Sequence, residues 1–143
     1  MVNQQEFRQK VNRLQQLNSQ VEAFQDQLDF IDNMIEGHNE AKKTMENYSK
    51  KESGSQLLVP IGANSYLLSK VGENDKVLIG LGADVSAEKE VGEAKEIVEK
   101  RKKEFKDTKD DLMEDFEEMK QQAQQLEQEV RQEYQELQSQ GQV

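Results

Sequence analysis

Apolar residues recur with heptad spacing through the first third of the chain. One series, in steps of seven residues, contains Phe7, Leu14, Val21, Leu28, Ile35 and Lys42. A second series, three residues later, contains Lys10, Leu17, Phe24, Ile31, His38 and Met45. Two mostly apolar series sustained over this length indicate a coiled coil rather than a lone surface helix. We therefore expect residues 4–50 to form a first long helix.

The last third of the chain carries the same kind of repeat. One series contains Val91, Val98, Phe105, Leu112, Met119, Leu126 and Glu133. The other contains Lys95, Lys102, Lys109, Phe116, Ala123, Val130 and Leu137. The pattern is strong after Phe105 and is diluted by lysines before it. It predicts a second long helix over residues 88–139.

The two repeats come into register when residues whose numbers add to 140 face each other in an antiparallel pair. This arrangement places Leu14 opposite Leu126 and Phe24 opposite Phe116. Composition alone does not guarantee that the two heptads match in phase. The match therefore predicts that the helices fold back on each other as a coiled coil.

The layers at the open end of this helical pair are less apolar than those in its middle. Phe7 would face Glu133, and Lys10 would face Val130. Several apolar residues would then lack good partners, namely Phe7, Val11, Val130, Tyr134 and Leu137. They could form an adaptable grip at a fraying end, or they could simply finish the coiled coil.

The middle segment, residues 53–86, predicts strands instead of helix. It holds most of the glycines, the only proline, Pro60, and clusters of Val, Ile and Leu. We expect one hairpin with strands at 57–61 and 66–68, and another with strands at 76–81 and 84–86. Pro60 is best tolerated at a sheet edge or a bulge.

Isolated two-stranded hairpins are marginal in water, so these strands need a partner. Pairing with the hairpins of other subunits is the expected solution. The candidate oligomerisation residues are Leu57, Leu58, Val59, Ile61, Tyr66, Leu67, Leu68, Val77, Leu78, Ile79 and Leu81. The fold class predicted is therefore α+β, a two-helix coiled coil connected by two β-hairpins that oligomerise.

Composition narrows the function classes. The 143 residues fit a single domain, residues 1–143, and their formal net charge of −10 argues against a nucleic-acid partner. There is no cysteine, which excludes disulfides and thiolate metal sites. A signal-peptide pattern and a membrane-length apolar run are both lacking, so we expect a cytoplasmic protein without a membrane partner.

The candidate catalytic and metal-binding motifs are weak. His38, the only histidine, has Glu36 and Glu40 nearby, but one histidine with mobile carboxylates makes a poor metal site. In the register above, it faces Lys102 as a structural polar residue. The acidic pairs 110–111 and 117–118 lie on a helix, where adjacent residues point in different directions and share no pocket. We expect no enzyme, no metal and no cofactor.

Two further motifs also have structural explanations. The fragment Gly80-Leu81-Gly82 lacks the lysine and hydroxyl residue of a phosphate-binding loop and fits a bulge or strand end. The basic run 100–103 is bracketed by Glu99 and Glu104. The register also sets it near Glu36 and Glu40, so ion pairing between the helices is the expected role.

The middle segment resembles the strand region of α-class prefoldin subunits. The matching stretches are LLVPI at 57–61 with Tyr66 after it, KVLIGLG at 76–82 and SAE at 86–88. That class has an LVP strand, a second short strand, a loop, and a VxVxxG strand leading into the second helix. The flanking coiled-coil segments match in length, so the resemblance covers essentially the whole chain.

This resemblance implies a chaperone subunit that works without ATP. Two α-class and four β-class subunits would join their hairpins into a β-barrel body, and the arm tips would hold unfolded polypeptides and pass them to a group II chaperonin. The tip residues would be Phe7, Val11, Leu14, Val130, Tyr134 and Leu137. Some α-like prefoldins instead assemble with copies of themselves into filaments, and the sequence leaves this alternative open.

Overall fold

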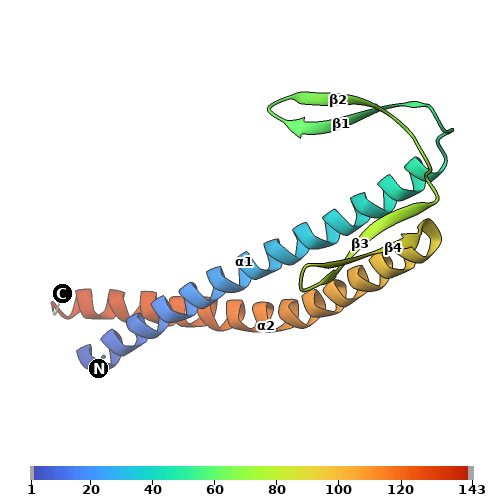
Figure 1. Ribbon diagram of the computed structural model, residues 1–143. Coiled ribbons are helices and arrows are strands. Elements are labelled where there is room, and N and C mark those ends of the chain that lie inside the picture. Colours follow the sequence, from blue (N-terminus) through green and yellow to red (C-terminus); the bar gives the residue numbers. More distant parts are fainter. Residues whose placement is uncertain (1, 142–143) are drawn as a thin grey trace. The chain divides into compact units, whose positions relative to one another are not determined.

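The computed structural model describes residues 2–141, which form two long helices and four strands in the order α1–β1–β2–β3–β4–α2 (Figure 1). Their bounds are α1 Gln4–Ser49, β1 Gln56–Gly62, β2 Ser65–Lys70, β3 Lys76–Gly82, β4 Val85–Glu90 and α2 Val91–Ser139. The predicted two helices and two hairpins are confirmed. β4 continues to Glu90 because it pairs along its whole length with β3, so α2 begins three residues after its expected start.

The chain divides into two compact units, and both helices run through each of them. The terminal unit consists of the residues up to Asn33 and those from Lys106 onward. The central unit is Met34–Phe105 and contains both hairpins.

The expected heptad positions form the interior of the terminal unit. Every residue of the four series that lies in this unit is buried or half-buried. The most buried of them are Leu17, Leu28, Ile31, Phe116, Ala123 and Leu137. The sequence periodicity therefore identified the stripe by which α1 and α2 meet.

Ion pairs between the helices measure the register. Lys109 Nζ lies 2.6 Å from Asp32 Oδ1 in the terminal unit. In the central unit, Lys95 Nζ lies 3.1 Å from Glu46 Oε1. In both pairs the residue numbers add to 141, against the predicted 140. The antiparallel register is thus confirmed to within one residue.

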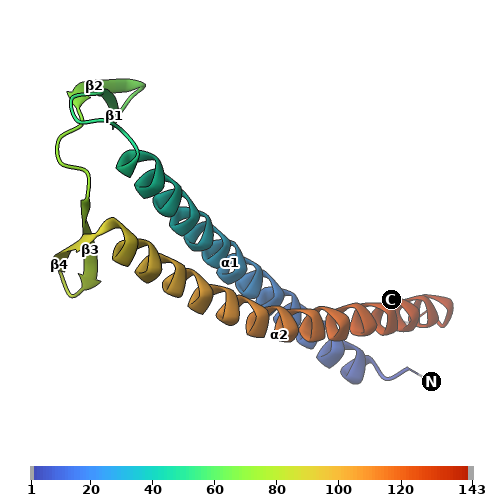
Figure 2. The same ribbon diagram turned by 90° about the vertical axis from the view of Figure 1, so that its right-hand side faces the viewer.

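Each hairpin closes through a two-residue turn (Figures 1 and 2). The turn residues Ala63–Asn64 and Ala83–Asp84 all have positive φ, between 49° and 59°. This is the conformation of a type I′ turn, whose twist matches that of the flanking strands. Gly62 and Gly82 precede the turns with φ of 96° and 98°, a region open mainly to glycine.

The two hairpins repeat each other with an offset of 20 residues. Gln56 pairs with Lys70 and Gly62 with Ser65 in the first hairpin, and every pair recurs 20 residues later in the second. The register shifts at the same place in both, between Pro60 and Gly62 and between Gly80 and Gly82. Of the alternatives expected, an edge or a bulge at Pro60 and a bulge or a strand end at the G-x-G fragment, the register shifts agree with a bulge at both sites.

The core of the central unit joins the second hairpin to α2. Ile79 of β3 packs with Ala94 and Val98 of α2, and all three are buried. Partly buried residues extend this cluster, namely Met45, Val77 and Ile97. One face of the second hairpin is therefore covered by the chain's own helices.

The Asn74 side chain fixes the end of α1. Its Nδ2 donates hydrogen bonds to the carbonyl oxygens of Tyr48, Ser49 and Lys51, at 3.0, 3.2 and 2.7 Å. The last carbonyl groups of a helix have no partner within it, so a side-chain donor from the loop before β3 satisfies them. This bond set holds the connection between the hairpins against the helix.

Candidate functional site

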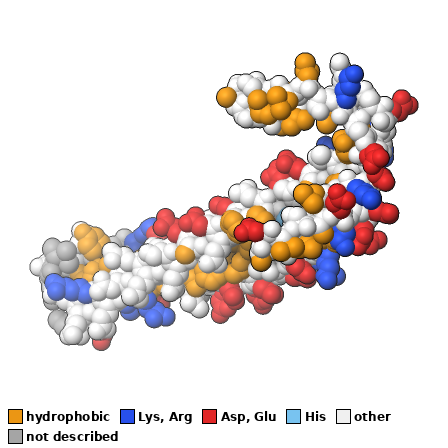
Figure 3. All heavy atoms as spheres, viewed as in Figure 1, with side chains coloured by type: hydrophobic (Ala, Val, Ile, Leu, Met, Phe, Trp, Pro, Cys, Tyr) orange, Lys and Arg blue, Asp and Glu red, His pale blue; other side chains and the backbone are white. Residues whose placement is uncertain are grey.

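The first hairpin, β1–β2, is the most exposed apolar surface that the structure describes. Leu58 lies directly opposite Leu68, and Val59 lies opposite Leu67. Successive residues of a strand point to opposite faces, so both faces of this hairpin carry apolar side chains. The exposed ones are Leu58, Val59, Ile61, Tyr66, Leu67 and Leu68, and Leu68 reaches 81% exposure. Figure 3 shows hydrophobic side chains gathered over this hairpin.

The second hairpin differs because one of its faces is occupied. Leu78 and Leu81 are exposed, whereas Val77 is half-buried and Ile79 is only 5% exposed. Ile79 was expected to pair with other subunits, but it packs against Ala94 and Val98 of its own chain. The side chain of Ile79 is thus covered within its own chain, and its role in pairing with other subunits stays a prediction.

Arg101 adds a polar contact to this docked face. Its Nη2 donates a hydrogen bond to the carbonyl oxygen of Gly80 at 2.7 Å. The sequence interpretation placed Arg101 in a basic run facing Glu36 and Glu40. The structure instead directs it to the backbone of β3, one residue after the buried Ile79.

Sequence reasoning missed three exposed apolar residues, Val85, Phe30 and Met113. Val85 begins β4 directly after the turn, and its apolar type inside an expected strand was a usable signal. Phe30 lies on α1 two residues after Leu28, off the heptad stripe, and is 62% exposed. An aromatic residue at a non-core heptad position was the signal there.

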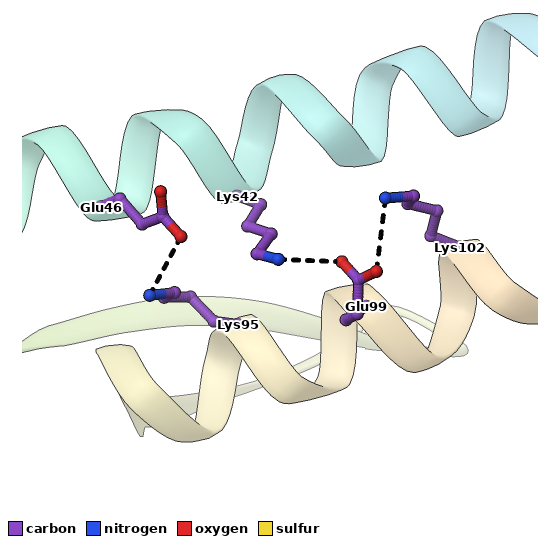
Figure 4. Close-up of polar contacts among 5 residues, drawn as sticks. All are labelled: Lys42, Glu46, Lys95, Glu99 and Lys102. Carbon is purple, nitrogen blue, oxygen red and sulfur yellow. Dashed lines mark hydrogen bonds and ion pairs between the residues drawn. The ribbon is translucent and has the colours of Figure 1, made fainter.

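Carboxylates and lysines bridge the helices in the central unit (Figure 4). Glu99 accepts hydrogen bonds from Lys42 at 3.2 Å and from Lys102 at 3.3 Å. These bonds lower the pKa of Glu99, and a bond from Lys95 likewise lowers the pKa of Glu46. The basic run 100–103 was expected to pair with the first helix, but Lys102 pairs with Glu99 of its own helix, and the interhelical ion pairs here join Lys42 to Glu99 and Lys95 to Glu46.

His38 has a structural role in the central unit. Its Nδ1 lies 2.6 Å from the carbonyl oxygen of Met34, which can only accept, so Nδ1 is the donor. The ring centroid lies 5.4 Å from that of Phe105. These contacts agree with the structural polar role expected of His38; the ring packs on Phe105, and Lys102, expected opposite it, forms an ion pair with Glu99.

At the helix ends of the terminal unit, Lys10 lies between two carboxylates. Its Nζ is 3.2 Å from Glu129 Oε2 and 2.5 Å from Glu133 Oε1. Hydrogen bonds to Glu133 and Glu129 raise the pKa of Lys10 above its ordinary value. We call this set the ion-pair fork. Lys10 was expected to face Val130, but the charged ends of all three side chains find one another instead.

An aromatic contact lies beside the ion-pair fork. The ring centroids of Phe7 and Tyr134 are 6.4 Å apart, with planes inclined by 25°. Phe7 was expected to lack a good apolar partner, and its stacking on Tyr134 shows that this part of the expectation is wrong. Leu137 is also covered, at 1% exposure, so it too lacks the accessibility expected of it.

We call the six predicted tip residues the helix-end cluster: Phe7, Val11, Leu14, Val130, Tyr134 and Leu137. The structure gathers them at the paired ends of α1 and α2 in the terminal unit. Tyr134 is 42% exposed, Leu137 is buried, and the other four are half-buried. The cluster is thus largely covered in this conformation.

The described residues contain neither a metal-binding group of side chains nor a membrane-spanning helix. Among residues 2–141, no group of three or more His, Cys, Asp or Glu side chains is placed to hold a metal ion. None of the described helices has an apolar stretch that would let it span a bilayer.

Comparisons with known proteins agree with this architecture. A family model described as Prefoldin subunit matches residues 17–136. Prefoldin subunit alpha of Methanothrix thermoacetophila is 33% identical over 95 residues, which cover 66% of this chain and 62% of that protein. Prefoldin subunit alpha of Methanobrevibacter smithii is 26% identical over 108 residues, or 76% and 73% of the two chains. The chain thus spans just under two thirds of the first relative's length and somewhat more of the second's.

A solved structure shares the fold. A chain from the cryo-EM structure of filamentous PFD from Methanocaldococcus jannaschii superposes with a TM-score of 0.70 at 23% identity. The match covers 80% of this chain and 95% of that one. Since the family model spans far more than half of the sequence, including both hairpins and most of each helix, the chain belongs to the prefoldin family.

Proposed function

We propose that this protein is a subunit of an ATP-independent chaperone that holds unfolded polypeptides at the paired ends of its helices. The observation that carries the proposal is the prefoldin family match over residues 17–136. The helix-end cluster supports it, because six apolar side chains gather where both helices terminate. The function requires no enzyme activity and no cofactor, and we place it in the cytoplasm.

The hairpins are the proposed assembly surface. An isolated two-stranded sheet with apolar side chains on both faces is marginal in water, and the first hairpin is of this kind. Hairpins from several subunits, joined edge to edge into a β-barrel body, would cover these faces and pair the free edges. The proposed partners are β-class prefoldin subunits, in a hexamer of two α-class and four β-class chains. A group II chaperonin is the proposed recipient of the held polypeptide.

Aggregation of guanidine-denatured citrate synthase tests the holding activity. We expect the full chain, mixed with a β-class subunit, to suppress light scattering after dilution of the denatured enzyme. A chain lacking residues 1–10 and 131–143 should lose most of this suppression. Equal suppression by the truncated chain would contradict holding at the helix ends.

Self-assembly into filaments is the second candidate function. It is favoured by the fold shared with filamentous PFD and by the exposed first hairpin, which copies of one chain could also cover. The solution mass of the purified chain separates the two proposals. A discrete species of about six chains that forms only with a β-class subunit supports the hexamer. Large, heterogeneous assemblies of this chain alone support the filament.

A further inference from the structure

The helix ends are closed over the residues proposed to hold clients. Phe7, Val11, Leu14 and Val130 are half-buried, and Leu137 is buried. Tyr134 is the one exposed member of the helix-end cluster, at 42%. A polypeptide that binds this cluster must therefore first displace contacts that the two helices make with each other.

The contacts that close the ends are of two kinds. The ion-pair fork joins Lys10 of α1 to Glu129 and Glu133 of α2. Stacking of Phe7 against Tyr134 joins the same two helix ends one turn farther out on α1. Both connections cross from one helix to the other, so separating the ends breaks them together.

The closure is weak enough to be reversible. Lys10 retains 35% side-chain exposure, Glu129 retains 56% and Glu133 retains 22%, so water and salt reach the fork and screen part of its attraction. Exposed ion pairs contribute little each, although a lysine shared by two carboxylates contributes more than a single pair. Helix termini are also the segments that open most readily.

We propose that the ion-pair fork is a latch: it holds the helix ends shut over the helix-end cluster, and client binding competes with this closure. The latch rests on the proposed holding function, because it regulates access to the same residues. It makes the accessible apolar surface depend on an electrostatic contact that is separate from the gripping side chains themselves. Loosening the fork raises client capture without changing any residue of the cluster.

A charge reversal and its rescue test the latch. Lys10→Glu places three carboxylates together and should open the ends. Adding Glu129→Lys and Glu133→Lys to that variant restores opposite charges and should close them again. The matched control is Lys109→Glu, which breaks the Lys109–Asp32 ion pair of the same unit at another heptad position.

Hydrogen exchange of the full-length assembled protein reads the latch directly. We expect K10E to speed amide exchange at residues 4–13 and 127–139 by about tenfold, since it removes an attraction and adds a repulsion of similar size. The triple variant should return to the wild-type rate. K109E should leave these end segments unchanged. Acceleration that spreads equally to residues 40–49 would overturn a local latch.

Holding of guanidine-denatured citrate synthase, measured at one fixed salt concentration, completes the test. The latch predicts that K10E suppresses aggregation at a two- to fivefold lower concentration than the wild type or the triple variant. The latch is overturned if amide exchange in K10E is unchanged, or if it is faster but K10E holds the client no better than the wild type. The proposed holding function still stands in both cases, provided that the wild-type protein suppresses aggregation. If the wild-type protein does not suppress aggregation, the proposed holding function itself is overturned. The wild-type assay alone is enough to recognise this outcome.

Discussion

Arg101 of α2 donates a hydrogen bond from Nη2 to the carbonyl oxygen of Gly80 in β3, at 2.7 Å. The neighbouring Ile79 is buried against Ala94 and Val98. The side chain of Ile79 and the backbone carbonyl oxygen of Gly80, both in β3, are therefore bound by the same helix. In the first hairpin, the position equivalent to Ile79 is Val59, which is exposed.

Removal of the guanidinium should loosen the second hairpin. Arg101→Met keeps an apolar stem but leaves the Gly80 carbonyl oxygen to water, so we expect a loss of about 1 kcal/mol in stability. Amide exchange across β3 and β4 should accelerate. Lys103→Met, an exposed site on the same helix, is the control. Equal exchange in both variants would show that the Arg101 bond does not hold the hairpin.

Truncation at the two equivalent positions should separate folding from assembly. Ile79→Ala leaves a cavity under α2 and should lower the free energy of unfolding by about 2–5 kcal/mol. Val59→Ala should change it by less than about 0.5 kcal/mol in single chains, because its side chain is exposed. Urea denaturation at a dilution where light scattering reports single chains measures both. Similar losses in the two variants would contradict the difference between the hairpins.

The glycine before each turn should be hard to replace. Gly62→Ala and Gly82→Ala force an alanine to φ values of 96° and 98°, which should cost about 1–3 kcal/mol each. A Cβ at either site meets no atom within 4 Å, so the cost is backbone strain and not crowding. Gly72→Ala, with open space and no positive φ, is the control. Melting temperatures of the three variants measure the cost. We expect G62A and G82A to melt at lower temperatures than G72A, and equal melting temperatures would contradict backbone strain at the turns.

Acid should weaken the ion pairs of the central unit. The pKa values of Glu46 and Glu99 are lowered from 4.5 by hydrogen bonds from lysines. A carboxyl group with a lowered folded pKa stabilises the fold above its unfolded pKa, and the contribution is lost as pH falls through the folded value. We expect the melting temperature to fall below pH 4.5, and to fall less in the double variant Glu46→Gln, Glu99→Gln. Identical pH profiles would show that these pairs do not stabilise the fold.

Asn74→Ala should fray the end of α1. The substitution leaves the carbonyl groups of Tyr48, Ser49 and Lys51 without their side-chain donor, at a cost of about 1–2 kcal/mol. Exchange should accelerate at residues 45–52 first. Asn64→Gly, in the turn of the first hairpin, is a matched control because glycine accepts the positive φ that Asn64 has. Unchanged protection at residues 45–52 in N74A would contradict the capping role.

The heptad positions were predictable because one periodicity governs each helix. Phe24, Leu28 and Ile31 occupy a stripe that any neighbouring helix must cover, so the sequence alone places them inside. The turns were also predictable, since Gly62 and Asn64 are residues that accept positive φ.

The polar contacts were not predictable to the same degree. Lys10 and Arg101 have long side chains whose charged ends can bind any of several acceptors within reach. Lys10 selects Glu129 and Glu133 over the layer opposite it, and Arg101 selects a backbone oxygen. The heptad register predicts the positions of Cα atoms, but it does not predict which acceptor the charged end of a long side chain will bind. The docking of Ile79 was missed for a related reason, because strand alternation gives the face of a residue and not what covers that face.

The 20-residue offset between the hairpins has a consequence for how this sequence can change over time. A substitution at Ile79 can be compensated within the same chain, at Ala94 or Val98, because these residues touch it. Val59 is exposed, so in the proposed assembly a substitution there would have to be matched by a change in the chain that covers it. In the proposed assembly, we therefore expect these two equivalent positions to change under different constraints, Ile79 together with residues of its own helix and Val59 together with residues of the subunit that covers it.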